Sequence, residues 1–330
     1  MMTLRLSTLV AVLTATVALA ANASAAPHGI LWAKGAKPVT PAVSGGLQYY
    51  GGPVISHPKV YAVFWGDSVD PETVSKIGPF FENMLDSTYM DMFRQYKTDI
   101  AAVDGRQGTN QTLNRGAYAG GIAIAPNNAS TSLSDADIQH ELDAQIAAGK
   151  LPAPSADSLY MIYFPAGISI AMDNIRSCQQ FCAYHEGFNS AKTGTPIFYG
   201  VMPVCGFGCG VAGSTFDSLT VVSSHECSEA VTDPFPTPGD KPAYPQAWND
   251  AGGQEVGDLC AQGNATVTGH GLTSAVQWEY DNSIGGCNQG PWSQNGAPSF
   301  SAASLVPRST RPAPVLDAVR ASPAAVFAGR

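Results

Sequence analysis

The sequence is short of charge. Only 13% of its 330 residues are Asp, Glu, Lys or Arg, whereas 45% are hydrophobic. With so few charges, repulsion between like charges is too weak to keep the chain disordered. The chain also lacks the composition of a coiled coil. The net charge of −9 argues against nucleic acid or an anionic membrane surface as a partner. We therefore expect a globular protein with a substantial core.

Several catalytic signatures are also missing. The chain has no Gly-x-Ser-x-Gly elbow for a serine nucleophile, no phosphate-binding loop and no internal repeat. Beyond the N-terminus, no apolar run is long enough to cross a membrane. These absences exclude the common serine hydrolases of the α/β type, the P-loop nucleotidases and insertion into a membrane after signal removal.

The N-terminus is typical of a secretory signal. Arg5 precedes an uncharged apolar run over residues 6–21, and small residues suited to cleavage surround Ala25. The run is shorter than the roughly 20 residues of a spanning helix. We predict a signal peptide over 1–26, an exposed lead-in over 27–44, one globular domain over 45–290 and a disordered or loosely attached tail over 291–330. The predicted location is extracellular or periplasmic.

The cysteines of an exported chain favour disulfides. Six of the seven would form three bridges, in any of 15 pairings, and a zinc knot is the alternative for the two Cys-x3-Cys pairs. Cys227 is predicted to be the free thiol because it lies within a predicted helix. The seven residues are Cys178, Cys182, Cys205, Cys209, Cys227, Cys260 and Cys287.

Hydrophobic periodicity and capping signals predict a mixed α/β domain with a central sheet. Asp70 marks one helix start, and Ser134 with Asp137 forms a capping box at another. Helices are expected over 71–96, as one helix or a pair, and over 134–148 and 215–233. Strands are expected over 60–66, 117–125, 159–164, 197–204, 247–250, 254–260 and 276–281.

The third predicted helix contains a motif with chemical potential, Ser224-His225-Glu226-Cys227-Ser228-Glu229. His225 and Glu229 are four residues apart and share a helix face. The layout matches the His-Glu-x-x-His zinc peptidases with Glu in place of the second His. His225 and Glu229 are the predicted zinc ligands, and Glu226 is the predicted general base. The alternative is a solvated helix face.

A third ligand is expected downstream, in a predicted hairpin over 248–260. Glu255 and Asp258 are three apart, so in a regular strand only one of them would face the helix. A bulge at Gly257 would bring both to the same side. His185 is a further candidate, although a lone histidine is more often structural. The alternative for the hairpin is that Asp250 and Gly252 only make its turn.

These motifs resemble the EXORDIUM/phosphate-induced protein family and its bacterial relatives. The resemblance spans roughly residues 45–290 and is most specific from His225-Glu226 through Glu229-Ala230-Val231-Thr232-Asp233-Pro234 and Trp248-x-Asp250 to Glu255-x-x-Asp258-x-Cys260. It implies export and a single domain. The plant members are associated with the cell wall and growth control, and the resemblance implies no particular catalytic activity.

Two classes of function follow. The first is a secreted zinc peptidase with a zincin-like domain, acting on a peptide or protein. The second is a non-catalytic extracellular binding protein for cell-wall polysaccharide or a surface partner, with aromatic stacking surfaces. In such a protein the same acids would hold a structural ion, such as calcium, without turnover. Ligands that converge in an open cleft favour the enzyme, and a buried or scattered arrangement favours the binding protein. The aromatic candidates are Trp248, Trp278, Tyr280 and Trp292.

Overall fold

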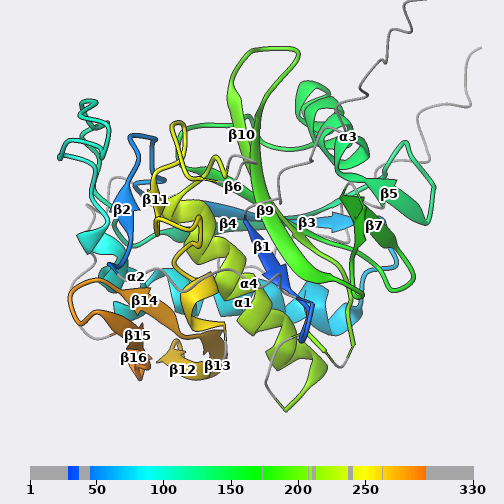
Figure 1. Ribbon diagram of the computed structural model, residues 1–330. Helices are drawn as coiled ribbons and strands as arrows, with labels where there is room; N and C mark the ends of the chain where they lie inside the picture. The colour runs from blue at the N-terminus through cyan, green and yellow to red at the C-terminus, as the bar shows by residue number, and fades with distance from the viewer. Residues whose placement is uncertain are drawn as a thin grey trace, which may run out of the picture.

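The computed structural model describes residues 29–36, 45–172, 174–206, 208–209, 213–236, 241–261 and 263–294. They form the predicted mixed α/β domain (Figure 1). Its centre is a six-stranded sheet in the order β1-β9-β10-β6-β3-β4. The strands are β1 (Ile30–Trp32), β3 (Lys59–Trp65), β4 (Ala117–Ile124), β6 (Ser158–Tyr163), β9 (Phe181–Asn189) and β10 (Pro196–Met202).

The sheet is parallel over four strands and antiparallel at one side. Strands β4, β3, β6 and β10 run parallel, with Tyr199 of β10 opposite Tyr160 of β6. Strand β9 then turns back antiparallel to β10, and β1 pairs antiparallel with β9. Strands β6 and β10 and most of β3 are buried on both faces, which is why they read as continuous hydrophobic runs, whereas the edge strand β4 is mostly only partly buried.

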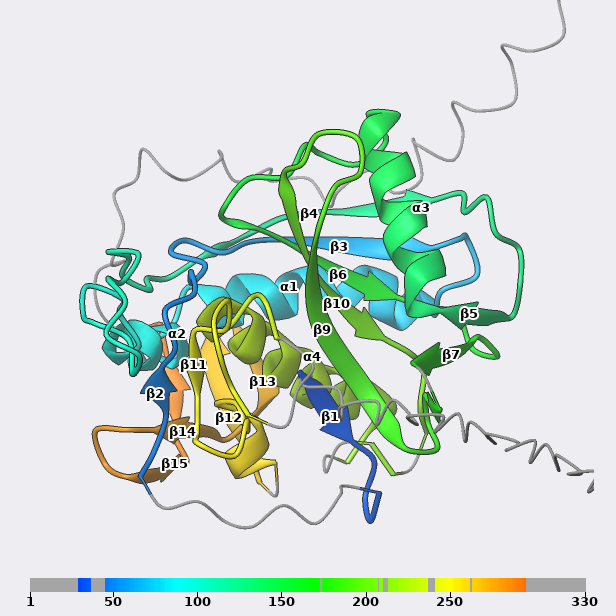
Figure 2. The same cartoon turned by 45° about the horizontal axis from the view of Figure 1, so that its top comes forward.

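Helices cover both faces of the sheet. Helices α1 (Pro71–Leu85) and α4 (Thr215–Thr232) pack on one face and α3 (Asp135–Ala147) on the other, as Figure 2 shows. Alternate residues of β3 supply the two cores: Phe64 joins the core under α1 and α4, and Trp65 joins the core under α3. This three-layer arrangement places α4 against β9 and β10.

The predicted helix starts are confirmed. Asp70 accepts hydrogen bonds from the amides of Glu72 and Thr73, and Ser134 with Asp137 forms the capping box of α3. The predicted segment 71–96 is a pair of helices, because Ser87 caps a second start. The pair is α1 and α2 (Thr88–Met92), followed by the 3-10 turn η1 (Phe93–Gln95).

Short strands complete the domain beside α4. Strand β13 (Leu272–Gln277) runs along α4 and pairs with β12 (Asn264–Gly269), which pairs with β16 (Trp292–Ser293). The other small sheets pair β11 (Trp248–Asn249) with β2 (Gln48–Tyr49), β14 (Glu279–Asp281) with β15 (Gly286–Asn288), and β7 (Ser169–Met172) with both β5 (Ser132–Ser134) and β8 (Ile175–Arg176).

Three sequence predictions need correction. The lead-in over 27–44 contains β1, whose Ile30 and Leu31 are buried in the main sheet. The tail over 291–330 begins inside the fold, because Trp292 is buried and pairs with β12. The expected strand over 254–260 is a turn leading into the 3-10 helix η2 (Asp258–Cys260). The signal peptide over 1–26 and the rest of the tail lie outside the described residues.

The six bridging cysteines are paired as disulfides. Cys178 pairs with Cys205, Cys182 with Cys209, and Cys260 with Cys287. The zinc-knot alternative is therefore wrong. Cys227 is the free thiol, as predicted, and it is buried. None of the described helices is long and apolar enough to span a membrane.

Candidate metal centre

Helix α4 is buried around its whole circumference in its second half. Every residue from Thr220 to Thr232 is buried, because β9 and β10 pack on one side of the helix and β13 on another. His225, Glu226 and Glu229 have no exposed surface at all. Glutamate is rarely buried completely unless it is paired. The solvated helix face is therefore excluded, and these side chains require partners inside the protein.

The ring of His225 is oriented by Gln277 of β13. Nδ1 of His225 lies 3.0 Å from the side-chain oxygen of Gln277. The amide nitrogen of Gln277 donates to the carbonyl oxygens of Gly257 and Trp278, so its oxygen must face the imidazole and accept the proton on Nδ1. Nε2 of His225 then points at Glu229, 3.1 Å from Oε1.

His185 enters the cluster from β9. Its neighbour Tyr184 packs into the core under α3, so the period-2 alternation of the strand directs His185 towards α4. Nε2 donates to the backbone carbonyl of Asp233 at 3.0 Å. Nδ1 faces the two glutamates of α4, 3.4 Å from Oε2 of Glu226 and 3.6 Å from Oε2 of Glu229. These contacts lie within ion-pair distance without hydrogen-bond alignment.

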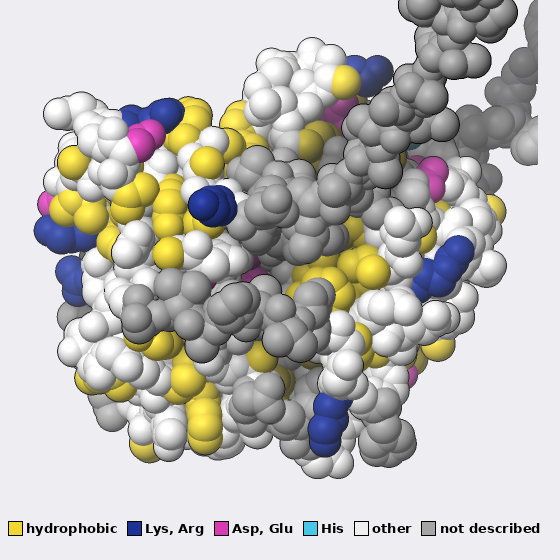
Figure 3. Space-filling view, viewed as in Figure 1, with side chains coloured by type: hydrophobic (Ala, Val, Ile, Leu, Met, Phe, Trp, Pro, Cys, Tyr) yellow, Lys and Arg dark blue, Asp and Glu magenta, His cyan; other side chains and the backbone are white. Residues whose placement is uncertain are grey.

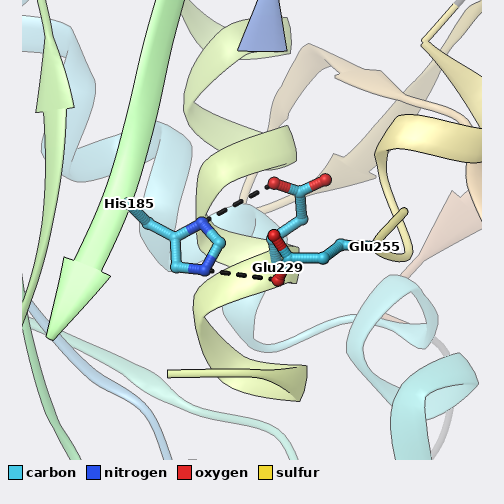
Figure 4. A group of neighbouring side chains, drawn as sticks. All are labelled: His185, Glu229 and Glu255. Carbon is cyan, nitrogen blue, oxygen red and sulfur yellow. Dashed lines mark ion pairs between the residues drawn. The ribbon is translucent and has the colours of Figure 1, made fainter. Parts of the chain in front are cut away.

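The loop before η2 brings both predicted acids to the cluster. Oε1 of Glu255 lies 3.4 Å from Nε2 of His185, as Figure 4 shows together with Glu229. The backbone amide of Asp258 donates to Oε1 of Glu229 at 3.0 Å. Both acids reach the helix because the segment is a turn, where the alternation of a strand does not apply.

Gly257 allows this close approach. A Cβ at Gly257 would lie 2.6 Å from Nδ1 of His225 and 3.1 Å from Oε1 of Glu229. The first distance is shorter than contact, so a side chain here would displace the loop or the imidazole. Asp250 has the structural role considered for it: its Oδ1 accepts from the amides of Gly252 and Gln254 and so holds the preceding turn.

Two groups of side chains have the spacing of metal ligands, and they share Glu229. In each group the possible ligand atoms lie within 4.8 Å of one another. The first group is His185, Glu229 and Glu255, and the second is His225, Glu229 and Asp258. Imidazole and carboxylate are ligands for zinc and other divalent ions. Metal-binding histidines commonly donate their second ring N–H to a carbonyl or carboxylate. Both histidines here have such an anchor.

The buried polar atoms indicate that a cation belongs here. Neither oxygen of Glu226 or Glu255 accepts a hydrogen bond within the described part of the chain, and Nδ1 of His185 and Nε2 of His225 make none there either. The ion pairs of these two glutamates within that part are with His185, which is charged only when protonated. Buried carboxylates without partners are costly. Divalent cations bound beside these atoms would compensate them.

The pKa values show how the protein compensates with protons. Burial raises the pKa of Glu226 to about 7, and burial raises that of Glu255 well above its usual value. Burial alone would lower the pKa of His225, but the nearby carboxylates, Glu229 foremost, raise it to about 10. Burial would also lower the pKa of His185, but Glu255, Glu226 and Glu229 together raise it well above its usual value. Protons on these groups are what a metal ion would replace.

Sequence reasoning missed three residues that support the cluster. Besides Gln277, Asp233 ties the end of α4 to β11 by accepting from the amide of Ala247 and the side chain of Asn249. Glu279 lies buried beside α4 and accepts from the hydroxyl of Tyr89. Polar and aromatic residues alternate over 277–280. This alternation is a sequence signal for the cluster, because it places the polar side chains of Gln277 and Glu279 on the same face of an extended segment.

The free cysteine and the aromatic residues provide no second functional site. Burial raises the pKa of the Cys227 thiol, so it is no candidate nucleophile. Trp248 and Trp292 are buried, and Trp278 and Tyr280 are partly buried against the core, so none forms an open stacking surface. A cavity of about 540 Å³ lies away from the cluster, lined by residues that include Thr88, Gln95, Asp281, Asn288 and Trp292.

The cluster is almost wholly buried. Asp258 is its one partly exposed member. In the space-filling view, a small acidic area is visible in a recess near the middle of the face, with hydrophobic side chains beside it (Figure 3). The ligands therefore converge as a metal centre requires, but they are buried and do not line an open cleft, and of the two expectations this burial favours the binding protein.

Comparison with protein-family models, curated proteins and solved structures returned no match to this chain.

Proposed function

We propose that this protein is a secreted metal-dependent hydrolase and, more specifically, a zinc peptidase. The observation that supports the proposal is the convergence of two anchored histidines on Glu229, with Glu226 and further carboxylates buried around them. Three disulfides are consistent with export. Membership of the EXORDIUM/phosphate-induced family stays part of the proposal.

His225, Glu229 and Asp258 are the proposed ligands of the catalytic ion, and His185 and Glu255 lie on the other side of Glu229. A bound zinc ion would supply Lewis acidity and a water of lowered pKa. Glu226 would accept the proton of that water. Burial raises its pKa to about 7 in the metal-free protein, and a carboxylate is one of the side chains that serve as general bases. Gln277 and the carbonyl of Asp233 hold the two imidazoles in place.

The Glu226→Gln variant tests the catalytic part of the proposal. Glutamine keeps the size of the side chain but cannot accept the proton, so hydrolysis of a peptide library should fall by about 10²- to 10⁴-fold. Zinc content should stay at the wild-type value. Glu82→Gln, at an exposed position on α1, is the control and should cleave at the wild-type rate. Full activity in both Glu226→Gln and His225→Ala would contradict the proposal.

A structural metal site in an extracellular binding protein is the second candidate. The complete burial of His185, His225, Glu229 and Glu255 favours it, because a closed site suits an ion that stabilises the fold without turnover. Calcium is a poorer fit than zinc, since two imidazoles face the centre and calcium takes oxygen ligands. A wild-type protein that binds zinc tightly but cleaves no peptide would select this second function.

A further inference from the structure

We infer that the cluster binds two divalent cations at once, with Glu229 as the carboxylate bridge between them. The inference rests on the proposed metal centre and deepens it, since a pair of ions is a different catalyst from a single ion. Paired metal sites about 3.5–4 Å apart can hold both the attacking and the leaving oxygen of a displacement.

The two oxygens of Glu229 face different histidines. Oε1 lies 3.1 Å from Nε2 of His225, and Oε2 lies 3.6 Å from Nδ1 of His185. Ions placed beside the two imidazoles would therefore each meet one oxygen of the same carboxylate. That is the arrangement of a bridging ligand.

Neither imidazole is free to turn to the other side. His225 is held by Gln277, whose own amide is fixed by two carbonyls. His185 is held by the carbonyl of Asp233. Each ring has one nitrogen anchored and presents the other to Glu229. Both presented nitrogens are buried and make no hydrogen bond in the described part of the chain.

Each side also has a second carboxylate of its own. Asp258 has metal-ligand spacing to His225, and Glu255 has it to His185, so each group has an imidazole, a second carboxylate and a share of Glu229. Oε1 of Glu255 lies nearest the anchored nitrogen of His185, 3.4 Å from Nε2, so its other contacts must adjust when an ion binds beside Nδ1. Glu226, the proposed general base, lies beside the His185 position, with Oε2 3.4 Å from Nδ1, and belongs to neither group of ligands. The two ligand groups have Glu229 alone in common, which is what two adjacent ions require.

Charge favours two ions over one. When ionised, Glu226, Glu229, Glu255 and Asp258 carry one negative charge each, and the histidines are neutral once they bind metal. One divalent ion leaves half of that charge uncompensated in a site that is almost wholly buried, whereas two divalent ions balance it. Uncompensated buried charge is strongly unfavourable.

Titration of the metal-free full-length protein with Co(II), a paramagnetic substitute for zinc, tests the inference. Calorimetry should give about two equivalents for wild type and about one for each of His185→Ala and His225→Ala. The exposed His140→Ala, on α3, should still bind two. Electron paramagnetic resonance of the two-cobalt wild type should show spin coupling, which needs no variant and so does not depend on how the variants fold.

The outcomes separate this inference from the proposed function. Two equivalents with spin coupling support both. One equivalent in the wild type, with an uncoupled cobalt signal, overturns the second ion and leaves the hydrolase proposal standing. No binding overturns both.

Discussion

Removal of bound metal with a chelator is expected to lower the free energy of unfolding strongly at pH 8 and much less at pH 5. A ligand present at a thousand times its Kd contributes about 4 kcal/mol of stability. The chelated protein loses that contribution. At pH 8 its buried carboxylates are also ionised with no cation to compensate their charge, which destabilises the fold further. At pH 5 protons compensate them and also compete with the metal for the same atoms.

The sign of the pH dependence follows from the direction of the pKa shifts. Glu226 has a pKa raised from 4.5 to about 7 in the folded metal-free protein, and His225 one raised from 6.5 to about 10. At a pH between its unfolded and its folded pKa, each group binds more protons in the folded state than in the unfolded state. Their stabilising contribution is complete below the unfolded pKa and is lost as the pH rises through the folded value.

Denaturant unfolding at pH 5, 6.5 and 8, with and without EDTA and without reductant, measures both effects. The chelated protein should become less stable from pH 5 to pH 8, and the gap to the metal-loaded protein should widen. A chelated protein that is equally stable at these pH values, or more stable at pH 8, would show that the cluster is not a set of proton-compensated metal ligands.

The Glu255→Gln variant is expected to stabilise the metal-free protein while it weakens metal binding. Both carboxylate oxygens of Glu255 lack a hydrogen-bond partner in the described part of the chain. A neutral side chain of the same size removes buried charge, so the gain at pH 8 should be on the order of 2 kcal/mol. Metal affinity should fall by at least about 10- to 100-fold, the loss that even outer-shell changes cause.

Glu141→Gln is the matched control, because Glu141 is equally buried but has its hydrogen bonds made. Its carboxylate accepts from the backbone and side-chain amides of Asn127 and from Gln145. Glutamine would turn a donor towards a donor there, at a cost of about 1–3 kcal/mol. If Glu255→Gln destabilised the chelated protein as much as Glu141→Gln, Glu255 would be a structural residue and the account of the cluster would be wrong.

The sequence predicts the helical half of the site well because that half is local. The i, i+4 spacing of His225 and Glu229 places both on one face of α4 without any tertiary information. Caps at Asp70 and Ser134 were predictable for the same reason, since a cap depends on residues within one turn. The central sheet followed from long hydrophobic runs such as β3 and β6.

The other half of the site depends on contacts that no local pattern contains. His185 reaches α4 only because β9 reverses direction beside β10, and a single histidine in a strand gives no sign of that pairing. The sequence pattern predicts a strand for Glu255 and Asp258. The structure has a turn there, because Asp250 accepts hydrogen bonds from two following amides and Gly257 has helical backbone angles. Strand β1 was missed because three apolar residues lie within a Gly- and Pro-rich stretch.

X-ray diffraction from crystals grown with zinc, recorded on both sides of the zinc absorption edge, tests the metal centre most directly. The account predicts an anomalous peak inside the cluster, about 2.0–2.2 Å from Nε2 of His225 and from a carboxylate oxygen of Glu229. An ordered cluster with no anomalous peak at His225, His185 or Glu229, at saturating zinc and pH 8, would contradict it.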